Sequence, residues 1–333
     1  MTAIRFVTRL FGAIAVSGFL VMAGVELSIS GGFKAVMLPL GINENSPRDL
    51  AIAETYNLRD GFWMRYLRWL WEMLGGDLGT SSRSGLPVTD MIVPRLSISG
   101  ELMLVAVIGA VALAIPLGLL AAAKAETPAG RAIDALLGIS QTVPVFITPY
   151  FLMWVFALKL QWLPASGWVR LTNSFGLHLQ HLALPAATLI FAEFGRIGRT
   201  VRADTVEVLK SDFITAAASK GLSTRYLLLR HALRPASLGS LNVIGMSIGS
   251  LLSGAVIVEL VFGIGGLGML LLEASLSRDL YLLLGLTTYM VVIYVCLSAV
   301  VDVAMRWADP RITVSRRPSM AERLSRFGLR PAT

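Results

Sequence analysis

Six long apolar runs constrain this chain more than any other feature of its sequence. Of the 333 residues, 55% are hydrophobic and 15% are charged, which is too apolar for a soluble domain of this size. Roughly 20 apolar residues suffice to cross a bilayer as a helix. The predicted spans are 8–29, 98–123, 132–158, 181–201, 236–262 and 281–305. The sequence therefore predicts an all-α polytopic membrane protein with six transmembrane helices.

The positions of the basic residues predict the orientation of these spans. Most of the 29 Lys and Arg residues lie at the termini and in the loops after the second and fourth spans, and such residues favour the cytoplasmic side. No convincing cleavage site follows the first span, so we interpret it as a retained helix rather than a signal peptide. We expect a multi-pass membrane protein with both termini in the cytoplasm. The net charge of +8 then reflects topology and attraction to anionic lipid, not nucleic-acid binding.

The spans divide the chain into four predicted parts. They are an N-terminal transmembrane helix (1–30), a large extracytoplasmic segment (31–95), a five-helix core (96–312) that contains the cytoplasmic loop 202–235, and a basic cytoplasmic tail (313–333). Within the extracytoplasmic segment, Trp and Tyr gather around two Arg residues between Phe62 and Leu74. This composition predicts a helix lying flat in the membrane interface. The alternative is that the rings pack against an extracytoplasmic partner.

The loop between the fourth and fifth spans has the pattern of two short helices. Ser211 is expected to cap the first helix, Gly221 to end it, and Ser223 to cap a second helix that runs to Pro235. A polar, basic pair of helices between two membrane spans would form a knob at the cytoplasmic surface. We expect such a knob to contact another molecule, although an ordinary amphipathic loop helix is the simpler alternative.

The knob resembles the coupling helix of membrane-spanning subunits of bacterial ABC importers. Their pattern of Glu-Ala-Ala, three residues and Gly corresponds here to Thr215-Ala216-Ala217 and Gly221, with Thr215 in place of the usual Glu. The resemblance implies that this knob sits in a cleft of a separate ATPase subunit, where small residues allow close approach of the two backbones. The residues that it assigns to this contact are Phe213, Thr215, Ala216, Ala217, Lys220, Gly221 and His231.

Further segments narrow the resemblance to the permeases of dipeptide, oligopeptide and nickel importers. The matching segments are Tyr66–Trp69, Gly76–Ser81, Pro87–Val88, Ile115–Gly118, Trp162–Gly167, His181–Ala186, Glu207–Leu209, Arg230–Arg234, Gly254–Glu259, Gly266–Gly268 and Asp309–Arg311. Their order covers about residues 62 to 312. The chain departs from the family in having Ser30–Phe33 where a Pro-Gly-Asp-Pro signature usually follows the first span.

Several expected absences concern catalysis and cofactors. The sequence has neither the Gly-x-x-x-x-Gly-Lys-Ser/Thr pattern of a phosphate-binding loop nor the His-Glu-x-x-His pattern of a metalloprotease. Cys296 is the single cysteine, and His178 and His181 lack a third ligand nearby, so we predict no metal site and assign the histidines to a solvated loop or a helix cap. We expect no catalytic residue and no cofactor on this chain, with ATP and Mg²⁺ bound by partner ATPase subunits.

Polar residues inside the spans are candidates for a substrate path, because ionisable groups there are costly and usually face protein or water. The deepest is Glu193, for which a helical ion pair with Arg196 is the structural alternative. Glu259 is a further candidate, and Gln141 and Thr142 offer uncharged hydrogen-bonding groups beside Pro144. Proline and glycine in the spans favour helices that move, although each position is equally compatible with plain packing.

Together with the resemblance, these observations predict the permease subunit of an ATP-driven, binding-protein-dependent importer in the bacterial inner membrane. The resemblance implies that a second homologous permease, one or two P-loop ATPase subunits and an extracytoplasmic substrate-binding protein complete the transporter. Short peptides are the leading substrate, and nickel or another small solute is the alternative. A stand-alone secondary transporter or channel, or a membrane scaffold, is a rival that leaves the ordered family segments unexplained.

Overall fold

Helices account for nearly all of the regular structure in the part of the chain that the structure describes. The computed structural model describes residues 3–28, 60–223, 226–277 and 279–308. Among them there is no strand, only one isolated bridge between Thr80 and Pro87. Five of the described helices are long and apolar enough to cross a membrane. The predicted all-α membrane fold is therefore confirmed.

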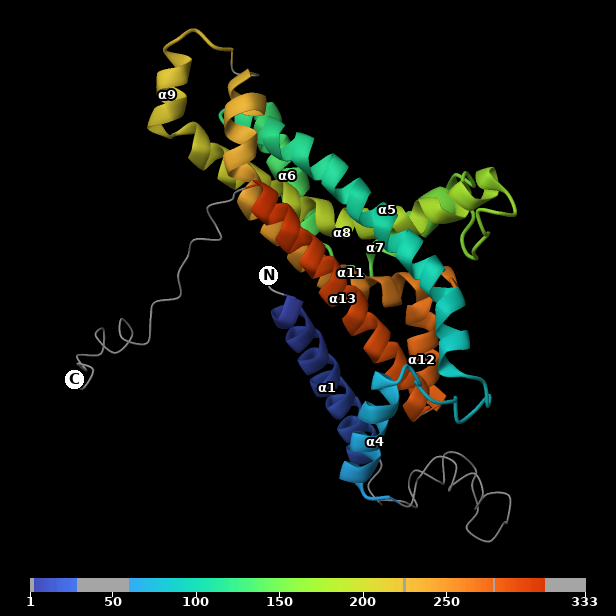
Figure 1. Cartoon of the computed structure of the whole chain (residues 1–333). Helices are drawn as coiled ribbons and strands as arrows, with labels where there is room; N and C mark the ends of the chain where they lie inside the picture. The colour runs from blue at the N-terminus through green and yellow to red at the C-terminus, as the bar shows by residue number, and fades with distance from the viewer. Residues whose placement is uncertain (1–2, 29–59, 224–225, 278, 309–333) are drawn as a thin grey trace, which may run out of the picture.

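Two long helices, α5 (Val88–Ala123) and α8 (Phe175–Leu209), form the centre of the fold (Figure 1). They make the most extensive contact between any two described helices. A Cβ atom added at Gly118 of α5 would lie 2.6 Å from the carbonyl oxygen of Gly198 in α8. Glycine at this crossing thus lets the two backbones touch.

Both central helices are longer than their predicted spans. The predicted boundary between the extracytoplasmic segment and the core at residues 95 and 96 falls inside α5, which begins at Val88. Similarly, α8 starts before residue 181, because the Ser174 hydroxyl accepts a hydrogen bond from the Leu177 amide at 3.4 Å. Apolar runs report where lipid surrounds a helix, whereas the backbone hydrogen bonds continue into the polar regions.

The third predicted span, 132–158, is not one helix, and this prediction was wrong. The segment contains α6 (Pro128–Thr142), a break, the short α7 (Thr148–Leu152) and a π-helix, η2 (Met153–Lys159). Pro144 explains the break, because a proline disfavours helical geometry in the residue before it, and Val143 has an extended ψ of 120°.

The C-terminal half of the core contains α11 (Leu233–Phe262), α12 (Leu267–Ser277) and α13 (Leu280–Ala308). A π-helix, η3 (Leu227–Ala232), precedes α11, so the helix predicted to end at Pro235 instead continues to Phe262. Pro235 lies just after η3, near the junction between the π-helix and α11. The short α12 was not predicted, since its apolar run is too short to span a bilayer.

The N-terminal helix α1 (Ala3–Ser28) packs along α13, and α4 (Phe62–Leu74) packs against both of them (Figure 1). Their shared core contains Ile14, Met22, Tyr66, Trp69 and Leu284. At the other end of the molecule, α8 leads into α9 (Asp212–Ala218), which projects beyond the remaining helices (Figure 1).

Candidate functional site

The projecting helix α9 follows α8 after a turn of two residues, Lys210 and Ser211. Ser211 occupies the N-cap position, but its hydroxyl donates to the carbonyl of Val208 at 2.5 Å and does not cap α9. The Thr215 hydroxyl, at the position where the family usually has Glu, donates back to the Ser211 carbonyl at 3.3 Å. The predicted helix is present, while the predicted side-chain cap is not.

The outer face of α9 is small and open, apart from one aromatic ring. Ile214 is 4% exposed and holds the helix against the body, whereas Phe213 is 50% exposed. Four more of the predicted contact residues are exposed: Thr215, Ala216, Lys220 and Gly221. Ala217 is half-buried. The face therefore offers backbone and short side chains that a partner can approach closely.

Glycine ends the helical segment as predicted. Gly221 has a φ of +79°, which side chains with a Cβ rarely adopt. Its amide donates to the Ala218 carbonyl at 2.9 Å, and the Ser223 hydroxyl accepts from the Tyr226 amide at 3.4 Å as the next helical turn begins. The side chain of His231, the last predicted contact residue, lies outside the described residues.

A polar pocket of about 420 Å³ lies between α6, α8 and α11. Two of the predicted path residues, Gln141 and Glu193, line it together. Three hydroxyl groups that the sequence analysis did not single out complete its polar lining: Ser140, Ser250 and Ser253. The helical spacing of Ser247, Ser250 and Ser253 along α11 was a signal that could have found two of these positions.

The carboxylate of Glu193 is held by two partners at this pocket. Glu193 is 4% exposed and forms the predicted ion pair with Arg196 one turn along α8. Ser250 on α11 accepts a hydrogen bond from Arg196 at 2.7 Å, and its hydroxyl lies 2.6 Å from Oε1 of Glu193. The pair therefore neutralises the buried charge and ties α8 to α11.

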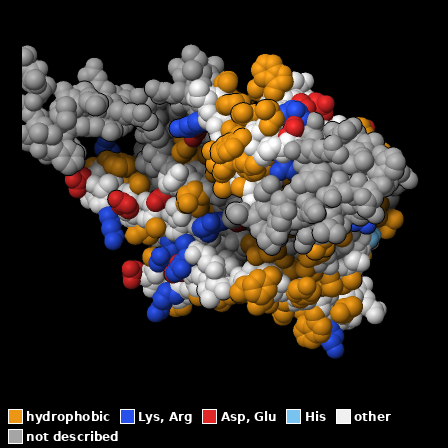
Figure 2. All heavy atoms as spheres, turned by 90° about the horizontal axis from the view of Figure 1, so that it is seen from below, with side chains coloured by type: hydrophobic (Ala, Val, Ile, Leu, Met, Phe, Trp, Pro, Cys, Tyr) orange, Lys and Arg blue, Asp and Glu red, His pale blue; other side chains and the backbone are white. Residues whose placement is uncertain are grey.

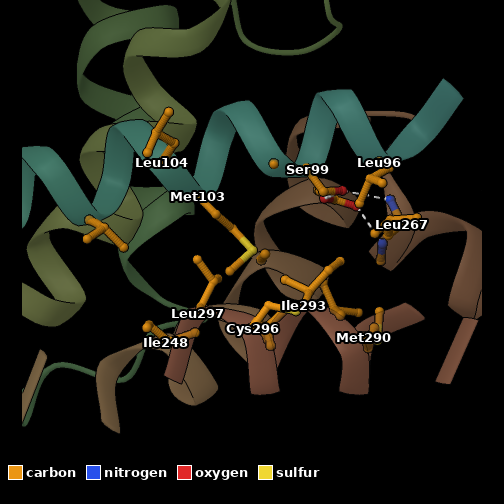
Figure 3. A pocket seen from close by; sticks show the side chains of 17 residues that line it. Leu96, Ser99, Met103, Leu104, Ile248, Leu267, Met290, Ile293, Cys296 and Leu297 are labelled. Carbon is orange, nitrogen blue, oxygen red and sulfur yellow. Dashed lines mark hydrogen bonds between the residues drawn. The ribbon is translucent and has the colours of Figure 1, made fainter. Parts of the chain in front are cut away.

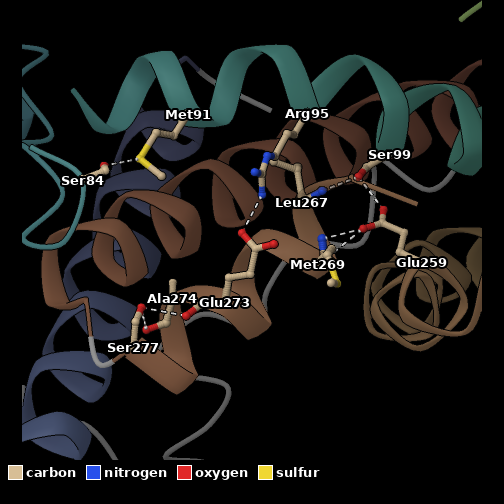
Figure 4. Close-up of polar contacts among 11 residues, drawn as sticks. Ser84, Met91, Arg95, Ser99, Glu259, Leu267, Met269, Glu273, Ala274 and Ser277 are labelled. Atoms are coloured by element: carbon tan, nitrogen blue, oxygen red, sulfur yellow. Dashed lines mark hydrogen bonds and ion pairs between the residues drawn. The ribbon is translucent and has the colours of Figure 1, made fainter. Parts of the chain in front are cut away.

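The other two predicted path residues do not line this pocket. Thr142 is exposed, and its hydroxyl donates to the Gly138 carbonyl at 3.0 Å. Glu259 lies at the far end of α11, where its carboxylate accepts from Ser99 at 2.5 Å and from the amides of Gly268 and Met269 at 2.7 and 3.2 Å (Figure 4). Glu259 thus caps the first turn of α12, where a negative charge is favoured.

A second cavity, of about 460 Å³, adjoins Glu259 and lies among α5, α11, α12 and α13 (Figure 3). Its walls are almost entirely apolar, with side chains such as Met103, Ile293 and Leu297. Cys296 also lines it. Because the Glu259 carboxylate is already occupied by hydrogen bonds, this cavity offers a polar solute little to bind.

His178 and His181 both make hydrogen-bonding contacts with backbone carbonyls of the loop before α8. His178 is buried, contrary to the predicted solvated position: its Nδ1 lies 2.7 Å from the Val169 carbonyl and its Nε2 lies 2.8 Å from Oε1 of Glu101. His181 Nδ1 lies 3.3 Å from the Gly167 carbonyl. In the described residues, no group of three or more His, Cys, Asp or Glu side chains is arranged to hold a metal ion.

One sequence pattern of hydrolases does occur, at Gly245–Gly249, which reads Gly-Met-Ser-Ile-Gly. Hydrolases use this pattern at a sharp turn between a strand and a helix. Here Ser247 is buried in the interior of α11. The structural context for a nucleophile is therefore missing at this serine.

The chain is similar to one protein family and to several known transport proteins. Residues 114–314 match the family described as "Binding-protein-dependent transport system inner membrane component". The chain is 34% identical over 262 residues to the oligopeptide transport system permease protein AppB of Bacillus subtilis (strain 168), covering 78% of this chain and 83% of that protein. It is 32% identical over 262 residues to OppB, the corresponding permease protein of Escherichia coli (strain K12), covering 78% and 84%.

A solved structure supports the same fold. It shows inward-facing conformations of the MetNI methionine ABC transporter, and its chain aligns with a TM-score of 0.55 and 15% identity. The alignment covers 66% of this chain and 96% of that chain. The family match and the relatives together establish that this chain belongs to the binding-protein-dependent transport system inner membrane components.

Proposed function

We propose that this chain forms half of the translocation path of an ATP-driven importer of short peptides. The relatives named as oligopeptide permeases align over 262 residues, which include both the polar pocket and α9. Nickel or another small solute is the alternative cargo. In this proposal the chain works with a second homologous permease, one or two P-loop ATPase subunits and an extracytoplasmic substrate-binding protein.

The observation that carries the mechanism is that a single continuous helix joins the two candidate sites. Along α8, Glu193 at the pocket lies about 24 Å from Leu209 at the start of the knob, given a rise of 1.5 Å per residue. A force applied to α9 is therefore transmitted to the pocket along one rigid element. The ion pair with Arg196 and the contact with Ser250 then pass the movement to α11.

The knob, α9 with the residues up to Gly221, is the part of the chain on which the ATPase subunit would act. Its exposed small residues and Gly221 fit a close contact with a partner surface, and ATP and Mg²⁺ would bind on that partner. Closure of the two ATPase subunits would pull the two knobs together and rock the helix bundles, so that the path opens to the other side. With both termini in the cytoplasm, α9 faces the compartment that contains ATP.

The pocket suits a peptide because its polar groups are mainly uncharged. Gln141 supplies an amide, and the hydroxyls of Ser140, Ser250 and Ser253, which donate their protons within the chain, keep lone pairs that can accept from a peptide backbone. The buried carboxylate of Glu193 is neutralised by Arg196, so the wall presents little net charge. A path of this kind tolerates many side chains, while the binding protein selects the substrate.

The test is purification of the chain from its native membrane in mild detergent, followed by identification of partners and assay of ATP hydrolysis. We expect a second permease, a P-loop ATPase, and hydrolysis that rises when the binding protein is added with a peptide. If ATP hydrolysis rose with a nickel chelate and not with a peptide, the proposed substrate would be wrong, while the proposed coupling mechanism would stand. Recovery of a homo-oligomer without ATPase would overturn the proposal in favour of a stand-alone transporter.

A further inference from the structure

We infer that α4 is seated in the lipid at the edge of the bilayer, with one face in direct contact with acyl chains. This face is defined by five exposed side chains, referred to below as the α4 stripe: Trp63, Met64, Leu67, Trp71 and Leu74. They are between 58% and 79% exposed. Their spacing places them on one side of the helix. All five are apolar, so the side of α4 that points away from the protein is the side least suited to water.

The opposite face of α4 fixes the helix firmly against α1. The Tyr66 hydroxyl donates to the carbonyl of Ala15 at 2.7 Å. Trp69 is 2% exposed and fills the space beside Gly18, where an added Cβ would collide with its ring. Phe19 of α1 meets the ring of Tyr66 edge-on, with ring centroids 5.7 Å apart. The direction of the α4 stripe is therefore set by packing and not by a mobile connection.

The contacts place α4 at the depth of the acyl chains. The apolar span of α1 ends at Val25, and the two residues of α1 that contact Tyr66, Phe19 and Ala15, lie about 9 and 15 Å inside that end at 1.5 Å per residue. On α13, whose span begins at Leu280, Leu284 packs in the same cluster as Trp69 and lies about 6 Å inside. Helices that lie in the interface bury their apolar face to about 5–10 Å. The contacts with both neighbours therefore lie about 6 Å or more inside the ends of the two spans, at the depth of the acyl chains.

The charges of α4 avoid the stripe. Arg65 is buried, Glu72 is half-buried, and Arg68 forms an ion pair with Asp60 at 2.7 Å. A surface that docks a soluble protein usually has a polar rim, whereas α4 packs on the membrane span α1, whose exposed side chains, such as Val16 and Leu20, are apolar as well. Hydrophobic side chains also gather in clusters on the end of the molecule seen in Figure 2. This continuity with a membrane span favours lipid as the occupant.

Tryptophan fluorescence tests the inference directly. The chain has seven Trp residues, and two full-length variants would each retain one of them, Trp71 or Trp69, with the others replaced by Phe. Each variant, together with its co-purifying partners, is reconstituted in phosphatidylcholine with or without bromine on the acyl chains. We expect brominated lipid to quench Trp71 at least twofold more strongly than buried Trp69, and acrylamide in the buffer to have little effect on either.

Two outcomes would overturn the inference. Quenching of Trp71 by acrylamide but not by brominated lipid would place the stripe in water. Protection of Trp71 from both quenchers would mean that protein covers it, either residues 29–59 of this chain or a partner subunit.

A labelling experiment makes the test independent of the multiple Trp replacements. In a Cys296→Ser background, Trp71→Cys should resist a water-soluble maleimide, because the thiol would lie in lipid, while Asp77→Cys in the exposed turn beyond α4 should react. Equal labelling of both would contradict lipid burial. Neither result depends on whether the chain carries peptides.

Discussion

Replacement of Gly221 should impair the coupling of ATP hydrolysis to transport without preventing folding. Its φ of +79° strains any side chain with a Cβ, although the surrounding space is open. We predict that Gly221→Val leaves the protein inserted and assembled but lowers peptide uptake at least tenfold, because the end of α9 would shift within its partner. Uptake of labelled peptide by cells, normalised to the amount of the chain in the membrane, measures this effect.

Two control variants show whether the backbone geometry at Gly221 is responsible. Gly85 also has a positive φ, +70°, and open space around it, but lies far from α9; Gly85→Val should therefore keep most of the uptake. Gly221→Asn should also transport, because Asn tolerates the left-handed region. Equal loss in Gly85→Val would show that the defect is not specific to the knob, and equal loss in Gly221→Asn would show that it does not come from backbone strain at Gly221.

Arg196 tests the role of the ion pair at the pocket. Replacing it with Met leaves the Glu193 carboxylate buried with Ser250 as its remaining partner, and removal of one partner of a buried pair costs about 3–5 kcal/mol. We predict a clear fall in the thermal unfolding midpoint in detergent for Arg196→Met. The double variant with Glu193→Gln should recover most of the loss. Additive losses in the double variant would show that the two side chains are not coupled.

Residue-scale prediction from the sequence succeeded where the chemistry was local. The pair of Glu193 with Arg196 and the conformation of Gly221 depend on neighbours one turn away along the chain. The cap on α12 could not be predicted in this way, because Glu259, Ser99 and Gly268 come together only when α5, α11 and α12 pack (Figure 4). His178 was misjudged for the same reason, since its partner Glu101 lies on another helix.

At the scale of elements, the packing of α6 on α8 depends on Gly195. A Cβ at this position would collide with the Ser140 hydroxyl and the Leu137 carbonyl. We predict that Gly195→Ala lowers the thermal unfolding midpoint and moves the wall of the pocket. Gly176→Ala is the control in the same helix, because a Cβ added at Gly176 would have no atom within 4 Å. This replacement should leave the stability of the protein unchanged or raise it by up to about 1 kcal/mol. Similar midpoints for the two variants would contradict the close approach of α6 and α8.

The anchoring of α12 by Glu259 is a second element-scale prediction. Glu259→Ala would leave the Ser99 hydroxyl and two amides without their acceptor, at a cost of about 1–3 kcal/mol for each buried group. Hydrogen exchange should speed up in the first turn of α12. Glu273→Ala is the matched control, because this carboxylate on the same helix is half exposed and pairs with Arg95 at 3.1 Å (Figure 4); exposed pairs contribute less than about 1 kcal/mol. Unchanged hydrogen exchange in the first turn of α12 in Glu259→Ala would contradict the anchoring role of Glu259.

Five of the six predicted spans correspond to long helices among the described residues, because apolar length reports membrane spans directly. It failed for 132–158, where hydrophobicity is continuous but Pro144 breaks the hydrogen bonding. It also missed α12, because an apolar run of eleven residues does not distinguish a short buried helix from part of a span. Element ends beyond the apolar runs, as at Val88, depend on backbone hydrogen bonds that hydropathy does not register.

At the scale of the whole molecule, we propose that α8 transmits movement from α9 to the pocket inside a larger assembly. The family membership shows the kind of assembly, while the cargo and the subunit composition belong to the proposal. In this proposal the energy source and the substrate-binding surface lie on other polypeptides, so the sequence of this chain alone does not determine either of them.

The most direct measurement is peptide accumulation in proteoliposomes that contain the purified complex, with ATP supplied on the α9 side. The account predicts accumulation that requires ATP, the ATPase subunit and the binding protein together, and that Gly221→Val abolishes while ATP hydrolysis continues. Peptide accumulation by this chain without the ATPase subunit, or driven by an ion gradient alone, would contradict it.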